Sequence, residues 1–251
     1  MAQIREIKKR MTAVGTIQRI TKTMQMIATA KFTAAVQRTN ATKPYSGTVR
    51  ELVEELSAKA GDVENPLLKA PEQPRGRELL LVISSDRGLC GAYNAHVLRA
   101  GLQHLRGLEG SGGSYDLEIS GKKAQAFFKF QKIEPTARHM IGDRPAYEEV
   151  ERIATRYMEA YADGRYDAVR VAYMRFHSNA RQRAKVAQLL PLTPAAVETP
   201  EEQAASGRQA PYEFSPSAEE LLASLLPLAV KSQLFQFFND AVVSEQIMRM
   251  V

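Results

Sequence analysis

The sequence opens with MAQIREIKKRMTAVGTIQRITKTMQMIATAKFTAAVQRTN, residues 1–40, and this stretch decides how the rest of the chain is organised. It predicts one long helix, because Gly15 is its only glycine and no proline occurs before Pro44. Forty helical residues would extend roughly 60 Å, which is longer than a compact domain of this mass requires. An apolar seam follows the coiled-coil period, with one shortened step between Val14 and Ile17 that would locally overwind a helix pair. The seam consists of Ile4, Ile7, Met11, Val14, Ile17, Ile20, Met24 and Ile27.

The positive charge of the chain is concentrated in the same stretch. Residues 1–40 contain eight lysines and arginines against one glutamate, a net charge of +7. Because the whole chain carries +6, the other 211 residues sum to −1. A helix of one sign indicates an acidic partner, which could be nucleic acid, anionic lipid or an acidic protein, and the plainer alternative is a solvated helix face.

The composition of the chain limits its possible domain number, disulfide bonds and location. The 251 residues allow one large or two smaller domains, and 44% hydrophobic residues suffice for a core. Cys90 is the single cysteine, which excludes an intrachain disulfide and fits a reducing compartment. No run of about 18 apolar residues is present, which predicts no membrane span. The charged N-terminus is not that of a secretory signal.

The centre of the chain alternates apolar strand-like runs with amphipathic helical stretches. This alternation predicts a mostly parallel, doubly wound sheet, with the last two strands able to pair. Predicted strands are 78–84, 115–120, 138–141, 168–178 and 183–190, and predicted helices are 95–108, 122–130 and 146–162.

A second helical seam appears at the other end of the chain. Ser217 followed by Glu220 is typical of a capped helix start, and Pro227 would begin a further segment or kink the helix. Neither terminal seam can be buried alone, so we expect the two helices to form an antiparallel coiled coil projecting from the central domain. The second seam is Val230, Leu234, Phe237, Ala241, Ser244, Met248 and Val251, in which only Ser244 is polar.

The predicted organisation therefore has four parts. They are an N-terminal coiled-coil helix over 1–60, a central α/β foot domain over 75–192, a proline-rich loop over 193–216, and a C-terminal coiled-coil helix over 217–251.

The turn SSDRGLCGAYN, Ser84–Asn94, lies between a predicted strand and helix, where α/β folds bind phosphate. It lacks the first glycine of GxGxxG and the Gly-Lys-Ser/Thr of a P-loop, so we interpret it as a tight turn. Cys90 is expected to be a packed thiol rather than a nucleophile. The four histidines form no close pair. We predict no catalytic residues, no cofactor and no metal site.

At this point four stretches together resemble one family, the gamma subunits of bacterial F-type rotary ATP synthases. They are IQRITKTMQMIATAKF (17–32), SSDRGLCGAYNAHVLR (84–99), QLLPL (188–192) and the segment that begins LLPLAVKSQLFQFF (225–251). The resemblance covers nearly the whole chain in order. It implies an α/β fold class: a long antiparallel coiled coil of the N- and C-terminal helices plus a Rossmann-like central α/β domain.

The resemblance also implies a function. Such a subunit is the central rotor stalk, a non-catalytic part of an enzyme complex, which couples ion flow through the membrane sector to ATP synthesis or hydrolysis. Its partners would be three alpha and three beta subunits, the epsilon subunit and the c-ring, with no nucleic acid. Its location would be the cytoplasmic face of the bacterial membrane, as a peripheral protein. The implied partner contacts are Lys8, Lys9, Arg10, Lys22, Met24 and Arg87.

The sequence departs from the family pattern at one place. The family's C-terminal helix continues for several turns past the position of Met250 and Val251, so we expect a truncated sequence or a short shaft tip. Two other interpretations remain open at this stage: a basic coiled-coil protein that binds nucleic acid, and a nucleotide-dependent enzyme that uses Ser84–Asn94.

Overall fold

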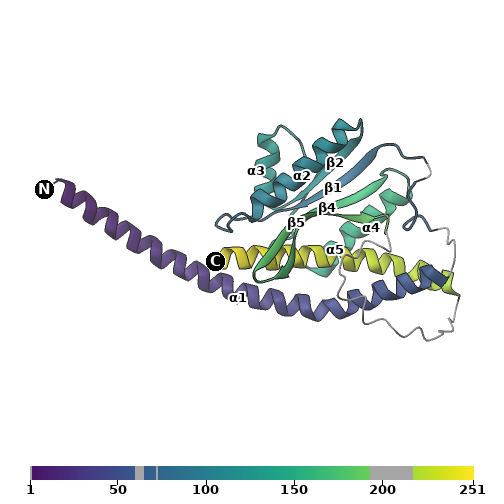
Figure 1. The fold of residues 1–251 in the computed structure, drawn as a ribbon, viewed down its shortest axis with the longest axis horizontal. Coiled ribbons are helices and arrows are strands. Elements are labelled where there is room, and N and C mark those ends of the chain that lie inside the picture. Colours follow the sequence, from purple (N-terminus) through teal and green to yellow (C-terminus); the bar gives the residue numbers. More distant parts are fainter. Residues whose placement is uncertain (1, 60–64, 72, 193–216) are drawn as a thin grey trace.

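The computed structural model describes residues 2–59, 65–71, 73–192 and 217–251, which are called the described residues below. Figure 1 shows an α/β body with two long helices lying along one side of it. The first is α1 (Ala2–Lys59), and the second is α5 (Ala218–Met250). The predicted fold class, a mixed α/β domain flanked by terminal helices, is confirmed. The predicted loop over 193–216 lies outside the described residues.

The body is built on a five-stranded sheet in the order β3-β2-β1-β4-β5. The strands are β1 (Arg77–Ile83), β2 (Ser114–Ser120), β3 (Ala137–His139), β4 (Ala168–Ser178) and β5 (Arg181–Leu190). The first four are mutually parallel, and β5 pairs with β4 in antiparallel register. The pairing predicted for the last two strands is therefore confirmed.

Helices cover both faces of the sheet, which is why β1 is a continuous apolar run. Leu80 and Val82 face α2 (Tyr93–Gly110) and α3 (Lys122–Phe130). Leu79 and Leu81 face α4 (Tyr147–Ala162) and α5 on the other side. The sequence places the helices correctly, with α2 two residues longer at each end than predicted.

The long helices pass through their prolines without a break. Pro44 lies inside α1 and Pro227 inside α5, so the segment boundary considered at Pro227 is not present. Buried residues on both sides of Pro227, Leu226 and Val230, anchor the helix to the core there. The predicted helix start is confirmed, since the Ser217 hydroxyl accepts a hydrogen bond of 3.3 Å from the Glu220 backbone N–H.

By length and composition alone, one described helix, over 219–250, is long and apolar enough to cross a membrane. This differs from the expectation of no candidate span. The segment is most of α5, and residues along it such as Leu222, Leu234 and Ala241 are buried in the core shared with the sheet. These residues of the segment are thus packed in the body of the molecule.

Candidate functional site

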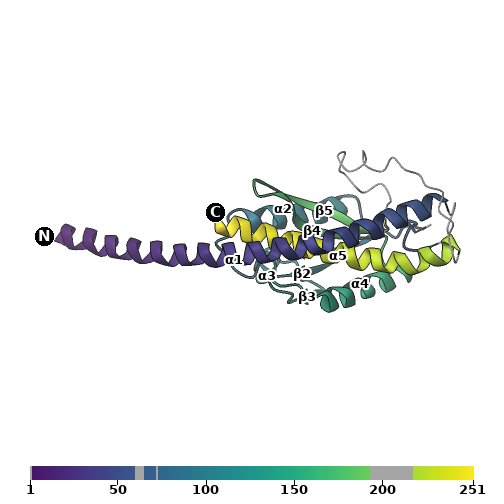
Figure 2. The ribbon, with the colours of Figure 1, turned by 90° about the horizontal axis from the view of Figure 1, so that it is seen from below.

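The first half of α1 stands free of the body. Figure 2, which turns the molecule by 90°, shows the same projection, so it is not an effect of one view. All but one of the predicted seam residues are exposed. Their exposed fractions run from 53% for Ile27 to 71% for Ile4, whereas Met24 is half-buried. Within the described residues, α5 does not reach this part of the seam.

The reason lies in the position of α5 along α1. Helix α5 runs antiparallel to α1, and its C-terminal end lies beside the middle of α1 (Figure 1, Figure 2). There Val242 and Val243 form a small core with Ala35. The seam up to Ile27 extends beyond the last residue of α5, whereas Ala28, Ala35 and the later apolar residues of α1 are buried.

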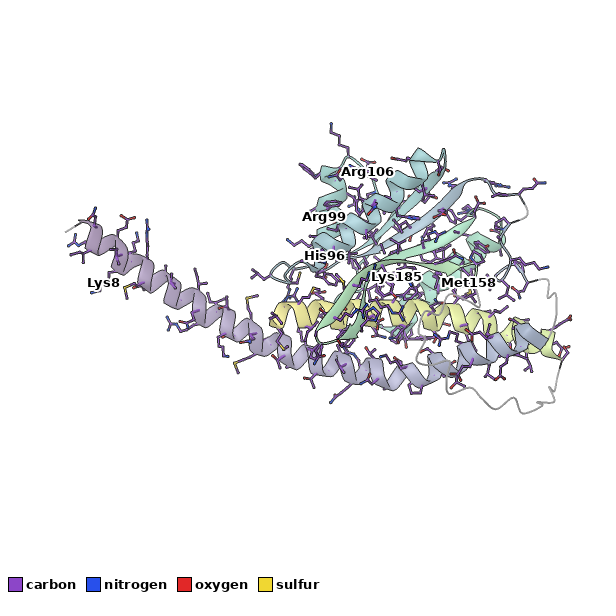
Figure 3. All side chains as sticks on the ribbon, in the orientation of Figure 1. Lys8, His96, Arg99, Arg106, Met158 and Lys185 are labelled. Atoms are coloured by element: carbon purple, nitrogen blue, oxygen red, sulfur yellow. The ribbon has the colours of Figure 1, made fainter. Side chains whose placement is uncertain are left out.

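The free end of α1 is also a basic surface. Lys8 marks its outer part in Figure 3. Lys8, Lys9, Arg10 and Lys22 are all exposed. Arg10 pairs with Glu6 at 2.6 Å, and Lys22 donates to Gln25 at 3.2 Å. The structure therefore places these four predicted contact residues on one helix with their charges facing solvent.

Arg87, the remaining predicted contact residue, lies elsewhere. It is an exposed residue of the turn after β1, on the body rather than on the projecting helix. Its backbone carbonyl accepts hydrogen bonds from the Ser85 hydroxyl at 2.6 Å and from the Arg249 guanidinium at 3.5 Å. The turn is thus linked to the end of α5.

The turn Ser84–Asn94 is held by its own side chains. Asn94 Nδ2 donates to Ser85 Oγ at 2.8 Å and approaches Cys90 Sγ at 3.1 Å, and the Cys90 thiol is buried. Leu89 and Gly91 both have positive φ, 58° and 55°, so this is a tight and partly strained turn.

The turn is also hydrogen-bonded to the backbone at the start of α3. The Ala124 N–H at the start of α3 donates to Ser84 Oγ at 2.8 Å, and the Lys122 N–H donates to the Asp86 carboxylate at 3.0 Å. Gly121, with φ of 93°, has no room for a side chain, because a Cβ would lie 2.3 Å from the Ser84 carbonyl oxygen. These contacts favour the interpretation of Ser84–Asn94 as a structural turn.

Helix α5 occupies the crevice beyond the carboxyl ends of the strands, where doubly wound folds bind ligands. Only a cavity of about 110 Å³ remains, lined partly by Ser84, Arg87, Glu245 and Arg249. Glu245 and Arg249 pair at 2.6 Å and are each about nine-tenths buried. Burial raises the pKa of Glu245, and the Arg249 charge offsets part of this increase.

The predicted seam of α5 packs against the sheet as well as against α1. Phe237 stacks on Tyr173 of β4 with ring centroids 4.5 Å apart. Ser244, the polar member of the seam, donates to the Met174 carbonyl oxygen of β4 at 3.2 Å. A sheet face offers more apolar surface than one helix. The seam residues therefore pack against the sheet, and neighbouring residues of α5 contact α1.

Helix α1 is tied to the body at the same end of the sheet. Lys31 forms a hydrogen-bonded ion pair with Asp143, in the loop that follows β3. The hydrogen bond from Lys31 lowers the pKa of the Asp143 carboxyl. Both long helices are thus joined to the body just before the point where α1 continues alone.

The described residues give little support for a metal site or for a reactive buried charge. Among the described residues, no group of three His, Cys, Asp or Glu side chains could hold a metal ion. One buried charge is paired on β2, where the Glu118 carboxylate accepts hydrogen bonds from Arg156, His139 and Tyr157. Burial acts to raise the pKa of Glu118, but these donors together lower it.

A long helix pair fixed to a doubly wound domain, with one helix projecting and the ligand crevice filled, is the arrangement of a stalk-type subunit. The family model described as "ATP synthase" matches residues 3–251. The chain is 38% identical over 255 residues to the ATP synthase gamma chain of Rhodopirellula baltica, and 35% identical over 252 residues to that of Leptospira biflexa. Each match covers 100% of this chain and 85% of the relative. The chain belongs to the gamma-chain family of ATP synthase.

The fold comparison agrees with this assignment. A chain from the central stalk and c-ring structure of the Tetrahymena thermophila mitochondrial ATP synthase superposes with a TM-score of 0.62 at 20% identity. The match covers 92% of this chain and 96% of that one. The resemblance to gamma subunits of ATP synthases predicted from the sequence is confirmed, and the family belongs to a membrane-associated complex. The nucleic-acid alternative has no support.

Proposed function

We propose that this chain couples ion flow through a membrane sector to ATP synthesis or hydrolysis by rotating as the central stalk of its complex. The partners would be three alpha and three beta subunits around the projecting helix, the epsilon subunit, and a c-ring at the foot. The location would be the cytoplasmic face of a bacterial membrane. The free end of α1, with its exposed seam and basic residues, is the observation that carries the proposal.

The free segment has the shape and chemistry of a shaft tip. From Ile4 to Ile27 it extends roughly 36 Å. Its apolar side chains would lose contact with water inside a protein ring, and its cations would face acidic residues of that ring. Rotation of this asymmetric tip would change the binding free energies of the surrounding subunits in turn, which is allosteric coupling in the strict sense.

Each part of the predicted four-part organisation would have its own task in this role. The foot over 75–192 would receive torque, and the ion pair between Lys31 and Asp143, with the contacts of α5, would pass it to the helix. Lys8, Lys9, Arg10, Lys22 and Met24 would contact the ring from α1. Arg87 would contact it from the body.

Reconstitution with alpha and beta subunits tests the proposal. The chain should co-purify with a ring of alpha and beta subunits and raise its ATP hydrolysis. Replacing Lys8, Lys9 and Lys22 by alanine should lower assembly and turnover. Replacing exposed arginines of α2, Arg99 and Arg106, should have a smaller effect. If the ring formed without retaining this chain, the proposed function would be wrong.

A further inference from the structure

Helix α1 contacts α5 through two different kinds of surface, one on each side of Pro44. After Pro44, α1 buries large apolar side chains, and Val53 and Leu56 belong to the core that is shared with the sheet. Before Pro44, over residues 28–43, the buried residues of α1 are small. They are Ala28, Ala35 and Thr39. We call residues 2–43 the arm, because they precede Pro44 and have little apolar surface to hold them to the body.

The face of α5 that covers the arm carries buried amides. Val243 of α5 packs with Ala35 of the arm. Asn239 and Gln246 lie on the same side of α5 as Val243, because they are four residues before it and three after it. Both are buried, with exposed fractions of 4% and 1%. Among the described residues, Asn239 Nδ2 and both amide atoms of Gln246 have no hydrogen-bond partner.

These amides disfavour the observed packing of the arm. A buried amide without a partner has lost its hydrogen bonds to water and gained none in return. The hydroxyls of the arm do not replace them, because Thr39 donates to the Ala35 carbonyl oxygen at 2.9 Å and Thr42 to the Thr39 carbonyl oxygen at 3.1 Å. An arrangement in which water reaches Asn239 and Gln246 would satisfy both amides.

The contacts that oppose such an arrangement are few. The ion pair between Lys31 and Asp143 joins side chains that are 40% and 45% exposed, and exposed pairs contribute little to stability. Phe32 of the arm meets Phe176 of β4 edge to face, with ring centroids 6.3 Å apart. Together with the small core around Ala35, these contacts close the arm onto the body.

Pro44 provides a place where α1 can bend. Proline has no N–H, so the Asn40 carbonyl oxygen cannot receive the usual helical hydrogen bond. Pro44 is exposed, and Gly47, a poor helix former, follows in the next turn. Sharp bends of long helices occur at such positions. The apolar anchor at Val53 and Leu56 begins just beyond this point.

We propose that the arm is a hinged element, which swings off α5 about Pro44 as an intact helix while α5 stays on the sheet. In the open state, Asn239 and Gln246 are hydrated and the ion pair of Lys31 is broken. Ile4 lies roughly 60 Å along the helix from Pro44, so a bend of about 10° would move this end by about 10 Å. The projecting end of α1 can then change its angle while the body keeps its structure. This device is internal to the chain and goes beyond the stalk role.

Thiol labelling of the intact chain with dithionitrobenzoate measures the opening. In a Cys90→Ala background, Ala35→Cys places a thiol between the arm and α5, and Ala241→Cys places one between α5 and the sheet. Ala35→Cys should react about tenfold faster or more, with a weaker dependence on urea, because opening exposes less surface than unfolding. Thr39→Cys, at a second buried site of the arm, should behave like Ala35→Cys. Equal rates and urea dependences at the arm and at Ala241→Cys would overturn the proposal.

A substitution at Gln246 tests the cause of the opening. Gln246→Leu removes the unpartnered amide and should slow the labelling of Ala35→Cys by about fivefold or more. Gln18→Leu makes the same change at an exposed position on the free end of α1 and should leave the rate unchanged. The proposal also fails if Gln246→Leu has no effect, or if both leucine variants slow labelling equally.

Hydrogen exchange distinguishes a swinging helix from local unfolding. Because the arm stays helical when it opens, the backbone amides of residues 30–43 should be protected more strongly than the thiol of Ala35→Cys. If these amides and the thiol reported the same opening equilibrium, the segment would be unfolding and the proposal would be wrong. No alpha or beta subunit is used, so the outcome is independent of the stalk proposal.

Discussion

Replacing Asp240 by asparagine should stabilise the protein above neutral pH. Asp240 lies on α5 and is 7% exposed. Burial raises the pKa of its carboxyl to about 6, although a hydrogen bond from Gln236 and the charges of Lys43 and Arg175 act in the opposite direction. The charged form is therefore disfavoured in the folded protein, and asparagine keeps the shape while removing the charge.

The sign and size follow from linkage. A carboxyl whose folded pKa lies above its ordinary value of 3.8 adds stability at low pH, and this stability is lost as the pH rises through about 6. The full difference of roughly two pKa units corresponds to about 3 kcal/mol. Between about pH 5 and pH 8, the Asp240 contribution should change by about 1.4 kcal/mol. The asparagine variant should lack that change.

Urea unfolding followed by circular dichroism at both pH values measures the difference. Asp240→Asn should gain about 1–2 kcal/mol relative to the wild type at about pH 8, and clearly less at about pH 5. Glu134→Gln is the control, because Glu134 is exposed and makes no hydrogen bond or ion pair among the described residues. An equal effect of Asp240→Asn at both pH values would refute the argument that burial of the charge is responsible.

Three further substitutions test the packing of Phe237, the close backbone approach at Gly121 and the cap of α5. Phe237→Ala removes the stacked ring and should lower the free energy of unfolding by about 3–5 kcal/mol, whereas Phe130→Ala, at an 81% exposed position, should change it by less than about 0.5 kcal/mol in urea titrations. Gly121→Ala forces a Cβ against a backbone oxygen and should lose at least about 2 kcal/mol in thermal unfolding. Gly107→Ala, inside α2 with open space, should be neutral or stabilising. Ser217→Ala removes the cap of α5 and should lower stability by about 1 kcal/mol, with faster amide exchange in the first turn.

The strand and helix order of the central domain could be predicted because the central strands β1 and β4 are mostly buried on both faces and each helix of that domain has one apolar side. The run from Glu78 to Ser84 and the stretch from Ala168 to Ser178 carry that signal locally. The partner of each seam could not be predicted in the same way. A heptad pattern indicates that Val230, Leu234 and Phe237 are buried, but not whether a helix or a sheet buries them.

The candidate site also has residues that could be predicted from the sequence and residues that could not. The basic residues of α1 could be found from the sequence, because their charge is concentrated in one stretch. The cluster around Glu118 could not, because its members are brought together from β2, β3 and α4 by the fold. Alternation along β2 would have shown only that Glu118 points to one face of the sheet. The link between Lys31 and Asp143 joins residues that are 112 positions apart, for which the sequence carries no local signal.

The position of α5 has a consequence for how the chain acquires its structure. Val171 and Tyr173 on β4 share a core with α5, which follows the five described strands in the sequence. A growing chain that has completed all five strands would still expose this face of the sheet to water and to other chains. Chaperone binding to the nascent protein should therefore persist until α5 has left the ribosome. Helix α1 is synthesised first, so it would remain unpacked against α5 for longer than any other helix.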